Sequence, residues 1–184
     1  STALGLGHAI LCAKPALSDE PFAVLLADDL IKSSKGAVQQ LIMAIDGSDR
    51  TIIGLEKIQP HQTCAYGVIS IRESMGQYVI ASNLVEKPKA EDAPSNLGVV
   101  GRYILPYEIF DVIEQLPNGS GGEIQLTDAL AVLARRDGVI GVLLEGRRFD
   151  CGSKLGFAQA NIEYGLEHPE IGENLKSYLK KLIG

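Results

Sequence analysis

The stretch Phe22-Ala-Val-Leu-Leu-Ala27-Asp28-Asp29 decides the fold class. Its continuous apolar run is typical of a strand buried on both faces of a largely parallel sheet. Two adjacent carboxylates follow the strand directly. Outward from it, strand-like runs alternate with helical patterns, which predicts an α/β layered fold with a mixed, largely parallel sheet.

Periodicity predicts the other elements. Further strands are expected at 51–55, 66–71, 78–85, 99–105 and 139–144, and helices at 8–13, 36–45, 107–116 and 126–136. Thr127 is expected to cap the last of these helices. Ser153 is expected to cap a later helix, which His168-Pro169 ends before a final helix. Apolar stripes on these last two helices favour a core or a subunit contact.

Length and composition predict one packed domain. With 184 residues, 46% of them hydrophobic, the chain can bury a core of its own. We expect a catalytic-fold core over 1–150 and C-terminal helices over 151–184, all within this domain.

Charge and cysteine usage exclude several classes of protein. The formal charge is −6 and the basic residues are scattered, so no stripe for nucleic acid is present. No apolar run reaches the roughly 18–20 residues that span a membrane. Cys12, Cys64 and Cys151 form neither a disulfide framework nor a CxxC metal site. We therefore expect a cytoplasmic protein with reduced thiols.

Three acidic positions are candidate ligand sites, each with a structural alternative. Asp28 or Asp29 could bind Mg²⁺ at a strand end, or form only a turn or a helix cap. At most one of them should face a crevice, because neighbours on an extended chain point opposite ways. Asp150 could be a second magnesium ligand, or could only favour the helix that Ser153 caps.

Two further segments have the same ambiguity. Glu86 and Lys87 could bind the hydroxyls and the phosphate of a sugar phosphate, or form an ordinary solvated pair. The turn Gly5-x-Gly7 could approach a phosphate or a base, or be structural. A third glycine is absent at Ile10, which excludes a dinucleotide-binding fingerprint.

Taken together, the motifs resemble those of bacterial UTP–glucose-1-phosphate uridylyltransferases. The similar stretches occur in the expected order across nearly the whole chain: 5–9, 64–68, 85–89, 93–97, 101–103, 122–128 and 150–156. The resemblance implies a Rossmann-like nucleotidyltransferase fold that joins UTP to glucose 1-phosphate, giving UDP-glucose and pyrophosphate. It also implies Mg²⁺ as cofactor and a homo-oligomer, a dimer or tetramer.

The resemblance also assigns roles to residues. Asp28 and Asp150 would be the magnesium carboxylates, with Asp28 and Lys87 catalytic. Lys87 would bind the sugar phosphate and Glu86 the glucose hydroxyls. Gly67 would approach the sugar and Gly7 the uracil. Asn96 matches a motif of the family without a role that we can assign.

One departure from the family pattern limits these expectations. The Gly-rich triphosphate loop of relatives should precede Gly5 by roughly a hundred residues and is not in this sequence, so the fold is expected to be incomplete at its N-terminus. We therefore expect the 184-residue chain to be inactive alone. Two alternatives remain: an enzyme that uses dTTP, CTP or ATP with another sugar phosphate, and a non-catalytic chain that binds sugar nucleotide.

Overall fold

The structure is a computed structural model that describes residues 4–45, 47–117 and 122–184. It contains two compact units, which we treat separately. Unit 1 comprises the chain up to Leu25 and Lys35–Glu145, and unit 2 comprises Leu26–Ser34 and Gly146–Gly184. These boundaries differ from the division at residue 150 expected from the sequence, and the single-domain organisation stays a prediction.

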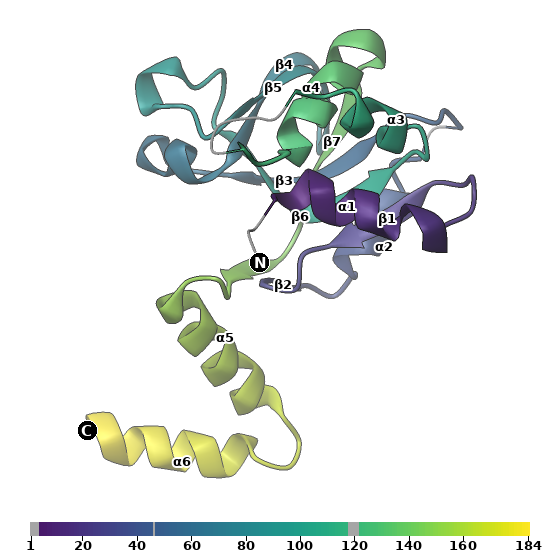
Figure 1. The fold of residues 1–184 in the computed structure, drawn as a ribbon. Coiled ribbons are helices and arrows are strands. Elements are labelled where there is room, and N and C mark those ends of the chain that lie inside the picture. Colours follow the sequence, from purple (N-terminus) through teal and green to yellow (C-terminus); the bar gives the residue numbers. More distant parts are fainter. Residues whose placement is uncertain (1–3, 46, 118–121) are drawn as a thin grey trace. The chain divides into compact units, whose positions relative to one another are not determined.

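Unit 1 is a sheet with helices on both faces (Figure 1). Its strands are β1 (Phe22–Leu25), β3 (Ile52–Lys57), β4 (Gly67–Met75), β5 (Tyr78–Glu86), β6 (Leu97–Leu105) and β7 (Val139–Leu143). Its helices are α1 (Leu6–Ala13), α2 (Ala37–Ile42), α3 (Ile109–Glu114) and α4 (Leu126–Asp137), with short 3-10 turns at Lys14–Ala16, Pro60–Ala65 and Ala90–Asp92. The strand order is β1-β6-β3-β7-β5-β4, with a further β6–β4 pairing.

The sheet is mixed but mostly antiparallel, so the expectation of a largely parallel sheet was wrong. Within the described residues, β3–β7 is the one parallel pair. The strands β4 and β5 are joined only by Gly76-Gln77, a two-residue turn that forces an antiparallel pair. The strand β1 pairs antiparallel with β6, and its residues alternate between half-buried and exposed. Apolar composition alone had not revealed that alternation.

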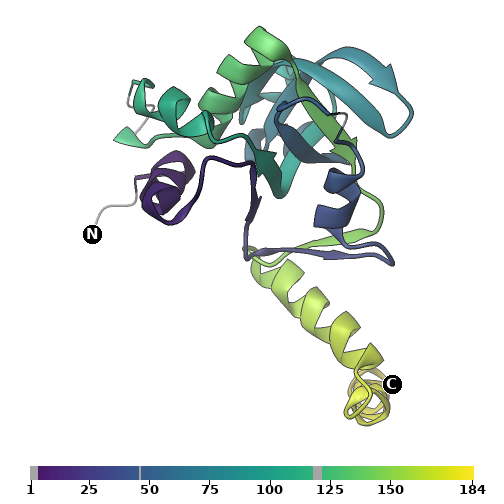
Figure 2. The ribbon, with the colours of Figure 1, turned by 90° about the vertical axis from the view of Figure 1, so that its right-hand side faces the viewer.

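Alternating side chains divide the core of unit 1 between the two faces of the sheet. Leu41 of α2 packs on one face against Ile52, Ile80, Ile104, Ile140 and Val142. The helices α1, α3 and α4 cover the other face, as Figure 2 shows. Phe110 of α3 is fully buried there and stacks on Phe22 at 5.3 Å. Each predicted helix and strand of this unit exists, with shifted ends.

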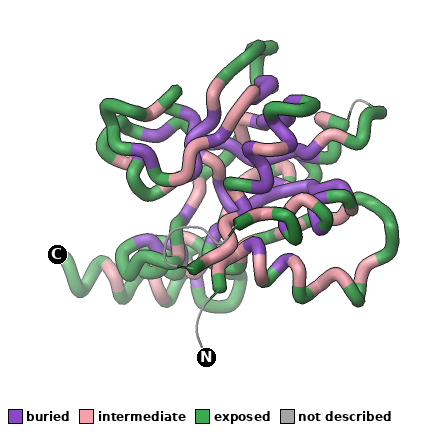
Figure 3. Tube along the Cα trace, turned by 45° about the horizontal axis from the view of Figure 1, so that its top comes forward, coloured by how far each residue is buried: buried purple, intermediate pink, exposed green. Residues whose placement is uncertain are grey.

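Unit 2 is a two-stranded antiparallel ribbon followed by two helices. The strands are β2 (Asp29–Lys32) and β8 (Arg147–Asp150), neither of which the periodicity had predicted. The helices α5 (Lys154–Glu167) and α6 (Gly172–Ile183) are separated at His168-Pro169, as expected. Buried residues are dense along the strands of unit 1, whereas α6 is mostly exposed (Figure 3).

Ion pairs tie the far end of the ribbon to α5. Lys32 lies 2.6 Å from Glu167 and 3.7 Å from Glu163, and Arg147 also pairs with Glu163. The hydrogen bond to Glu167 is the main cause that raises the pKa of Lys32 above its ordinary value. These ion pairs lie at one end of the ribbon, and Asp28 and Asp150 lie at the other.

Candidate functional site

Asp28 and Asp150 meet at one end of the ribbon of unit 2. Asp28 lies in the turn that precedes β2, and Asp150 is the last residue of β8. In the β2–β8 register, Asp29 lies opposite Asp150, and the amide of Cys151 donates a hydrogen bond of 2.7 Å to the Asp28 carbonyl. Antiparallel pairing therefore brings together two acids that are far apart in the sequence.

The two carboxylates border a space that Gly152 leaves open. A Cβ atom on Gly152 would lie 3.0 Å from Asp28 Oδ2 and 3.1 Å from Asp150 Oδ1. Both acids are exposed, and the Gly152 amide donates to Asp150 Oδ1 at 3.1 Å. The space is accessible because residue 152 has no side chain.

This donor set fits Mg²⁺. Magnesium ions in proteins bind to one or two carboxylates, with waters and substrate phosphates as the other ligands. No cluster of three His, Cys, Asp or Glu side chains that could hold a metal occurs in the described parts of the chain. Such a pair alone would leave coordination positions for phosphate oxygens.

Local hydrogen bonds also occur at Asp150. The bond from Gly152 is an Asx turn, and α5 is capped by Ser153, whose Oγ accepts from the Gly156 amide at 3.0 Å. The Ser153 cap is thus confirmed. Asp150 precedes this cap by three residues, so the alternative that its charge only favours the N-terminus of α5 stays open.

Asp29 has a different environment from Asp28. Only 6% of Asp29 is exposed, and its Oδ1 accepts a hydrogen bond from Arg148 Nε. The Asp29 carboxylate on β2 is therefore held by a side chain of the neighbouring strand, β8.

Glu86, Lys87 and Gly67 form a second cluster, in unit 1. Glu86 ends β5, half-buried and opposite Gly67 of β4 in the register. A Cβ atom on Gly67 would lie 3.4 Å from Glu86 Oε2 and 3.2 Å from Thr127 Oγ1. Lys87 is exposed, with Nζ 3.5 Å from Glu86 Oε1. The cluster therefore presents a carboxylate, an ammonium and a hydroxyl near one close-packed backbone position.

Lys87 also has an unusual backbone. Its φ of 45° is the one positive φ among the described non-glycine residues. Its amide donates to the Tyr66 carbonyl at 2.9 Å, which holds this conformation. Left-handed backbone at a non-glycine residue costs energy and is found preferentially at functional sites.

Thr127 was assigned the wrong role from the sequence. We expected it to cap α4, but the cap position is Gln125 and Thr127 lies in the first turn. The periodic pattern did not fix the helix start to within two residues. The threonine hydroxyl instead lies near Gly67, which makes Thr127 a candidate site residue that the pattern had not indicated.

The glycines at the start of α1 are required by packing within unit 1. The Gly7 amide donates to the Ile124 carbonyl at 2.9 Å, and a Cβ atom there would lie 2.7 Å from Ile124 Cγ2. Gly5 has a φ of 89°. The proposed approach of Gly7 to uracil stays a prediction. Asn96 is exposed, and its carbonyl accepts from the Ile58 amide at 3.0 Å.

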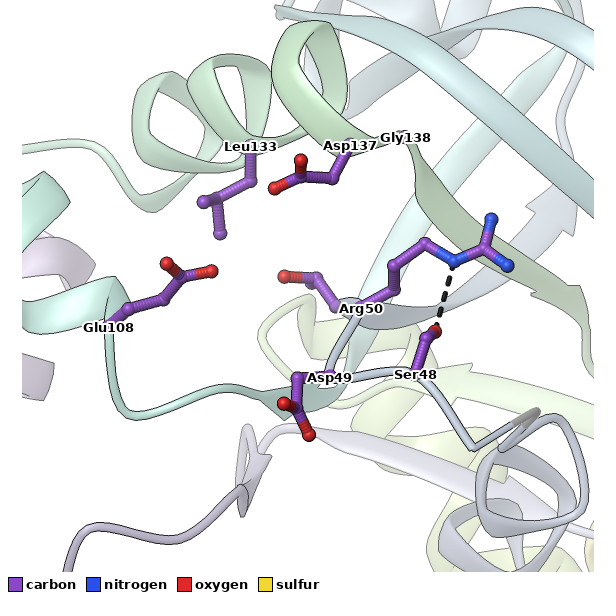
Figure 4. A pocket seen from close by; sticks show the side chains of 8 residues that line it. Ser48, Asp49, Arg50, Glu108, Leu133, Asp137 and Gly138 are labelled. Carbon is purple, nitrogen blue, oxygen red and sulfur yellow. Dashed lines mark hydrogen bonds between the residues drawn. The ribbon is translucent and has the colours of Figure 1, made fainter.

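A pocket of about 300 Å³ in unit 1 is lined by none of these residues. Figure 4 shows the Glu108 and Asp137 carboxylates directed toward it, next to Leu133. Both acids pair with Arg136, and these hydrogen bonds raise the pKa of that guanidinium. Two of the three acidic residues that line the pocket are therefore already paired with a cation.

Comparison with known proteins gives consistent matches over nearly the whole chain. A "Nucleotidyl transferase" family profile matches residues 1–165. UTP–glucose-1-phosphate uridylyltransferase YngB of Bacillus subtilis is 44% identical over 98% of this chain and 61% of its own length. UTP–glucose-1-phosphate uridylyltransferase 2 of Staphylococcus saprophyticus is 44% identical over 97% of this chain and 62% of its own length. The chain thus spans about three fifths of the length of these relatives.

Solved structures agree with this assignment. A UTP-bound UDP-glucose pyrophosphorylase of Acinetobacter baumannii superposes with a TM-score of 0.86, at 41% identity over 97% of this chain and 62% of that one. A UDP-glucose pyrophosphorylase complexed with UDP-glucose superposes with a TM-score of 0.85, at 38% identity over 91% of this chain and 64% of that one. The resemblance to bacterial UTP–glucose-1-phosphate uridylyltransferases is thereby confirmed. The chain belongs to the nucleotidyl transferase family.

Proposed function

We propose that the whole protein that carries this chain transfers a uridylyl group from UTP to glucose 1-phosphate, giving UDP-glucose and pyrophosphate. The observation that carries this proposal is the similarity to uridylyltransferases over 98% of the chain. The pairing of Asp28 with Asp150 and the grouping of Glu86 with Lys87 support it independently, because both suit phosphate and sugar ligands.

The reaction needs positioning and charge neutralisation rather than a covalent nucleophile. An oxygen of glucose 1-phosphate attacks the α-phosphorus of UTP, the bond to the β-phosphate breaks, and pyrophosphate leaves. The attacking phosphate is ionised near neutral pH, so no general base is required. Bound Mg²⁺ would neutralise phosphate charge.

Each cluster has a part in this scheme. Asp28 and Asp150 would hold Mg²⁺ against the phosphates. Lys87 would neutralise the sugar phosphate, and Glu86 would accept hydrogen bonds from glucose hydroxyls. The left-handed backbone of Lys87 would direct its ammonium before the substrate binds. Gly67 would let the sugar approach the β4 backbone, and Gly7 would lie near the uracil.

Substitution of Lys87 tests the proposal. In the whole protein, Lys87→Ala should lower kcat/KM for pyrophosphate release by about 100-fold, the loss of about 3 kcal/mol expected for a central electrostatic group. Lys89→Ala removes the same charge from an exposed position two residues later and should have little effect. Equal kinetics for the two variants would refute the role of Lys87.

Comparison of nucleotides tests the substrate. Pyrophosphate release with glucose 1-phosphate should be fastest with UTP among UTP, dTTP, CTP and ATP. A preference for another nucleotide would favour the alternative enzyme, and no turnover with any of them would favour a sugar-nucleotide-binding protein.

We also propose self-association through the C-terminal helices. Several large apolar side chains of α5 and α6 are exposed, including Leu155, Tyr178, Leu182 and Ile183. In the described parts of the chain, no helix is long and apolar enough to cross a membrane. Light scattering should give a dimer or tetramer, and a monomer at micromolar concentration would contradict this.

A further inference from the structure

A largely buried ion pair lies beside Asp28 and Asp150, the two proposed metal carboxylates, in unit 2. The side chains of Arg148 and Asp29 are 14% and 8% exposed. In the neighbouring pair, the side chains of Arg147 and Glu163 are 56% and 29% exposed. Exposed pairs contribute little, whereas removal of one partner of a buried pair leaves an uncompensated charge.

The β2–β8 register places this pair at the end of the ribbon where Asp28 and Asp150 meet. Asp29 lies directly opposite Asp150, and Arg148 precedes Asp150 by two residues on the same face of β8. Arg148 is thus the diagonal neighbour of Asp29. Like charges directly opposite each other in a sheet repel, so Asp29 and Asp150 would push apart without a cation between the strands.

We propose that Arg148 is a positioning residue for the metal site: by holding the Asp29 carboxylate, it fixes the ribbon end from which Asp28 and Asp150 face one ion. The inference rests on the magnesium role of these two acids in the proposed function. It also explains why Asp28 rather than Asp29 is available, since Asp29 is engaged on the neighbouring strand.

Binding of Mn²⁺ to the whole protein, followed by electron paramagnetic resonance, tests this role without turnover. Arg148→Gln should weaken Mn²⁺ binding about tenfold, as is typical when a residue that supports a metal ligand is lost. A purely electrostatic role of Arg148 predicts tighter Mn²⁺ binding in this variant, because loss of a cation near a cation site strengthens binding. An unchanged or tighter Kd would overturn the proposal.

Arg147→Gln is the matched control. It makes the same charge change one residue away, at an exposed side chain that points to the other face of β8. Its Mn²⁺ affinity should stay within about twofold of the unchanged protein. An equal loss in both variants would mean that any arginine on β8 has this effect, and would overturn the specific role of Arg148.

Two more variants distinguish a positioning role of Arg148 from an effect of its charge and from a loss of folding. Arg148→Lys keeps the charge but loses the planar donor, and should still weaken Mn²⁺ binding several-fold. The double variant Asp29→Asn/Arg148→Gln restores charge balance with two amides that can hydrogen-bond, and should recover most of the lost affinity. Failure to recover, with a thermal unfolding transition still present, would overturn the proposal.

Failure of the proposed function gives a different result. Asp28→Asn and Asp150→Asn should each abolish Mn²⁺ binding at this site if the two acids hold the ion. Unchanged binding in those variants would refute the metal site itself. Lost binding there, combined with normal binding in Arg148→Gln, would refute only the role of Arg148.

Discussion

A single methyl group at residue 152 should separate metal binding from folding. In Gly152→Ala the added carbon would stand 3.0 Å from Asp28 Oδ2 and 3.1 Å from Asp150 Oδ1, closer than the 3.4 Å at which ordinary contact begins. Each oxygen would have to move by a few tenths of an ångström. The methyl would also fill the space between the two acids, where Mg²⁺ requires ligand oxygens at about 2.0–2.1 Å.

The expected loss is large for binding and small for stability. Displacing the ligands should weaken Mn²⁺ or Mg²⁺ binding by about 10- to 100-fold, or about 1.4–2.8 kcal/mol. Gly152 does not have a left-handed φ, so alanine fits its backbone. Alanine for glycine at such a position stabilises by about 0.4–1 kcal/mol through the unfolded chain, which offsets the local crowding.

The assay combines Mn²⁺ titration by electron paramagnetic resonance with urea unfolding and pyrophosphate release. Gly36→Ala is the control, because Gly36 has a φ of −52° and no atom within 4 Å of the added carbon. We expect normal unfolding for both variants, and weakened metal binding and turnover for Gly152→Ala only. If Gly152→Ala bound Mn²⁺ normally, the convergence of Asp28 and Asp150 on that space would not be functional.

Two other substitutions test separate parts of unit 1. Gly67→Ala would crowd the Thr127 hydroxyl at 3.2 Å and bring a methyl group into contact with the Glu86 carboxylate at 3.4 Å, so the KM for glucose 1-phosphate should rise about tenfold with little change in unfolding; an unchanged KM would place the sugar elsewhere. Thr51→Val removes a buried hydroxyl that has no hydrogen-bond partner among the described residues, and should stabilise the protein by about 1 kcal/mol in urea unfolding. Destabilisation in that variant would mean that water satisfies the hydroxyl.

Periodicity predicted the elements whose burial is repetitive along the chain. Leu126, Leu130 and Leu133 of α4 recur on one helical face and are all buried, and the Ser153 cap follows from local hydrogen bonding. The direction of the strands was not contained in the apolar runs. It follows from connections such as Gly76-Gln77, whose length permits only an antiparallel pair.

The ribbon of unit 2 shows why the candidate metal site could not be derived from spacing. Its strands Asp29–Lys32 and Arg147–Asp150 are short and rich in charge, so neither has an apolar pattern to predict it. Only their mutual pairing brings Asp28 beside Asp150. Resemblance to a family assigned these acids a magnesium role, which stays a prediction. The residues alone left a turn or a cap as the alternative for Asp28, and a favourable charge at a helix N-terminus as the alternative for Asp150.

Charge balance shows why the three acids at this end of the ribbon must differ in role. In the proposed metal site, two carboxylates would match the charge of one divalent ion. The site would still have to attract the triphosphate, and a third ionised acid would repel the phosphates that the ion is proposed to bind. The structure meets this requirement by pairing Asp29 with Arg148 while Asp28 and Asp150 stay exposed. Under the proposed function, these adjacent and chemically identical residues have opposite requirements: Asp28 would need access to the ion, and Asp29 would need a permanent cation. Replacement of Arg148 by a neutral residue should therefore weaken metal binding, even though it makes the surroundings of the site more negative.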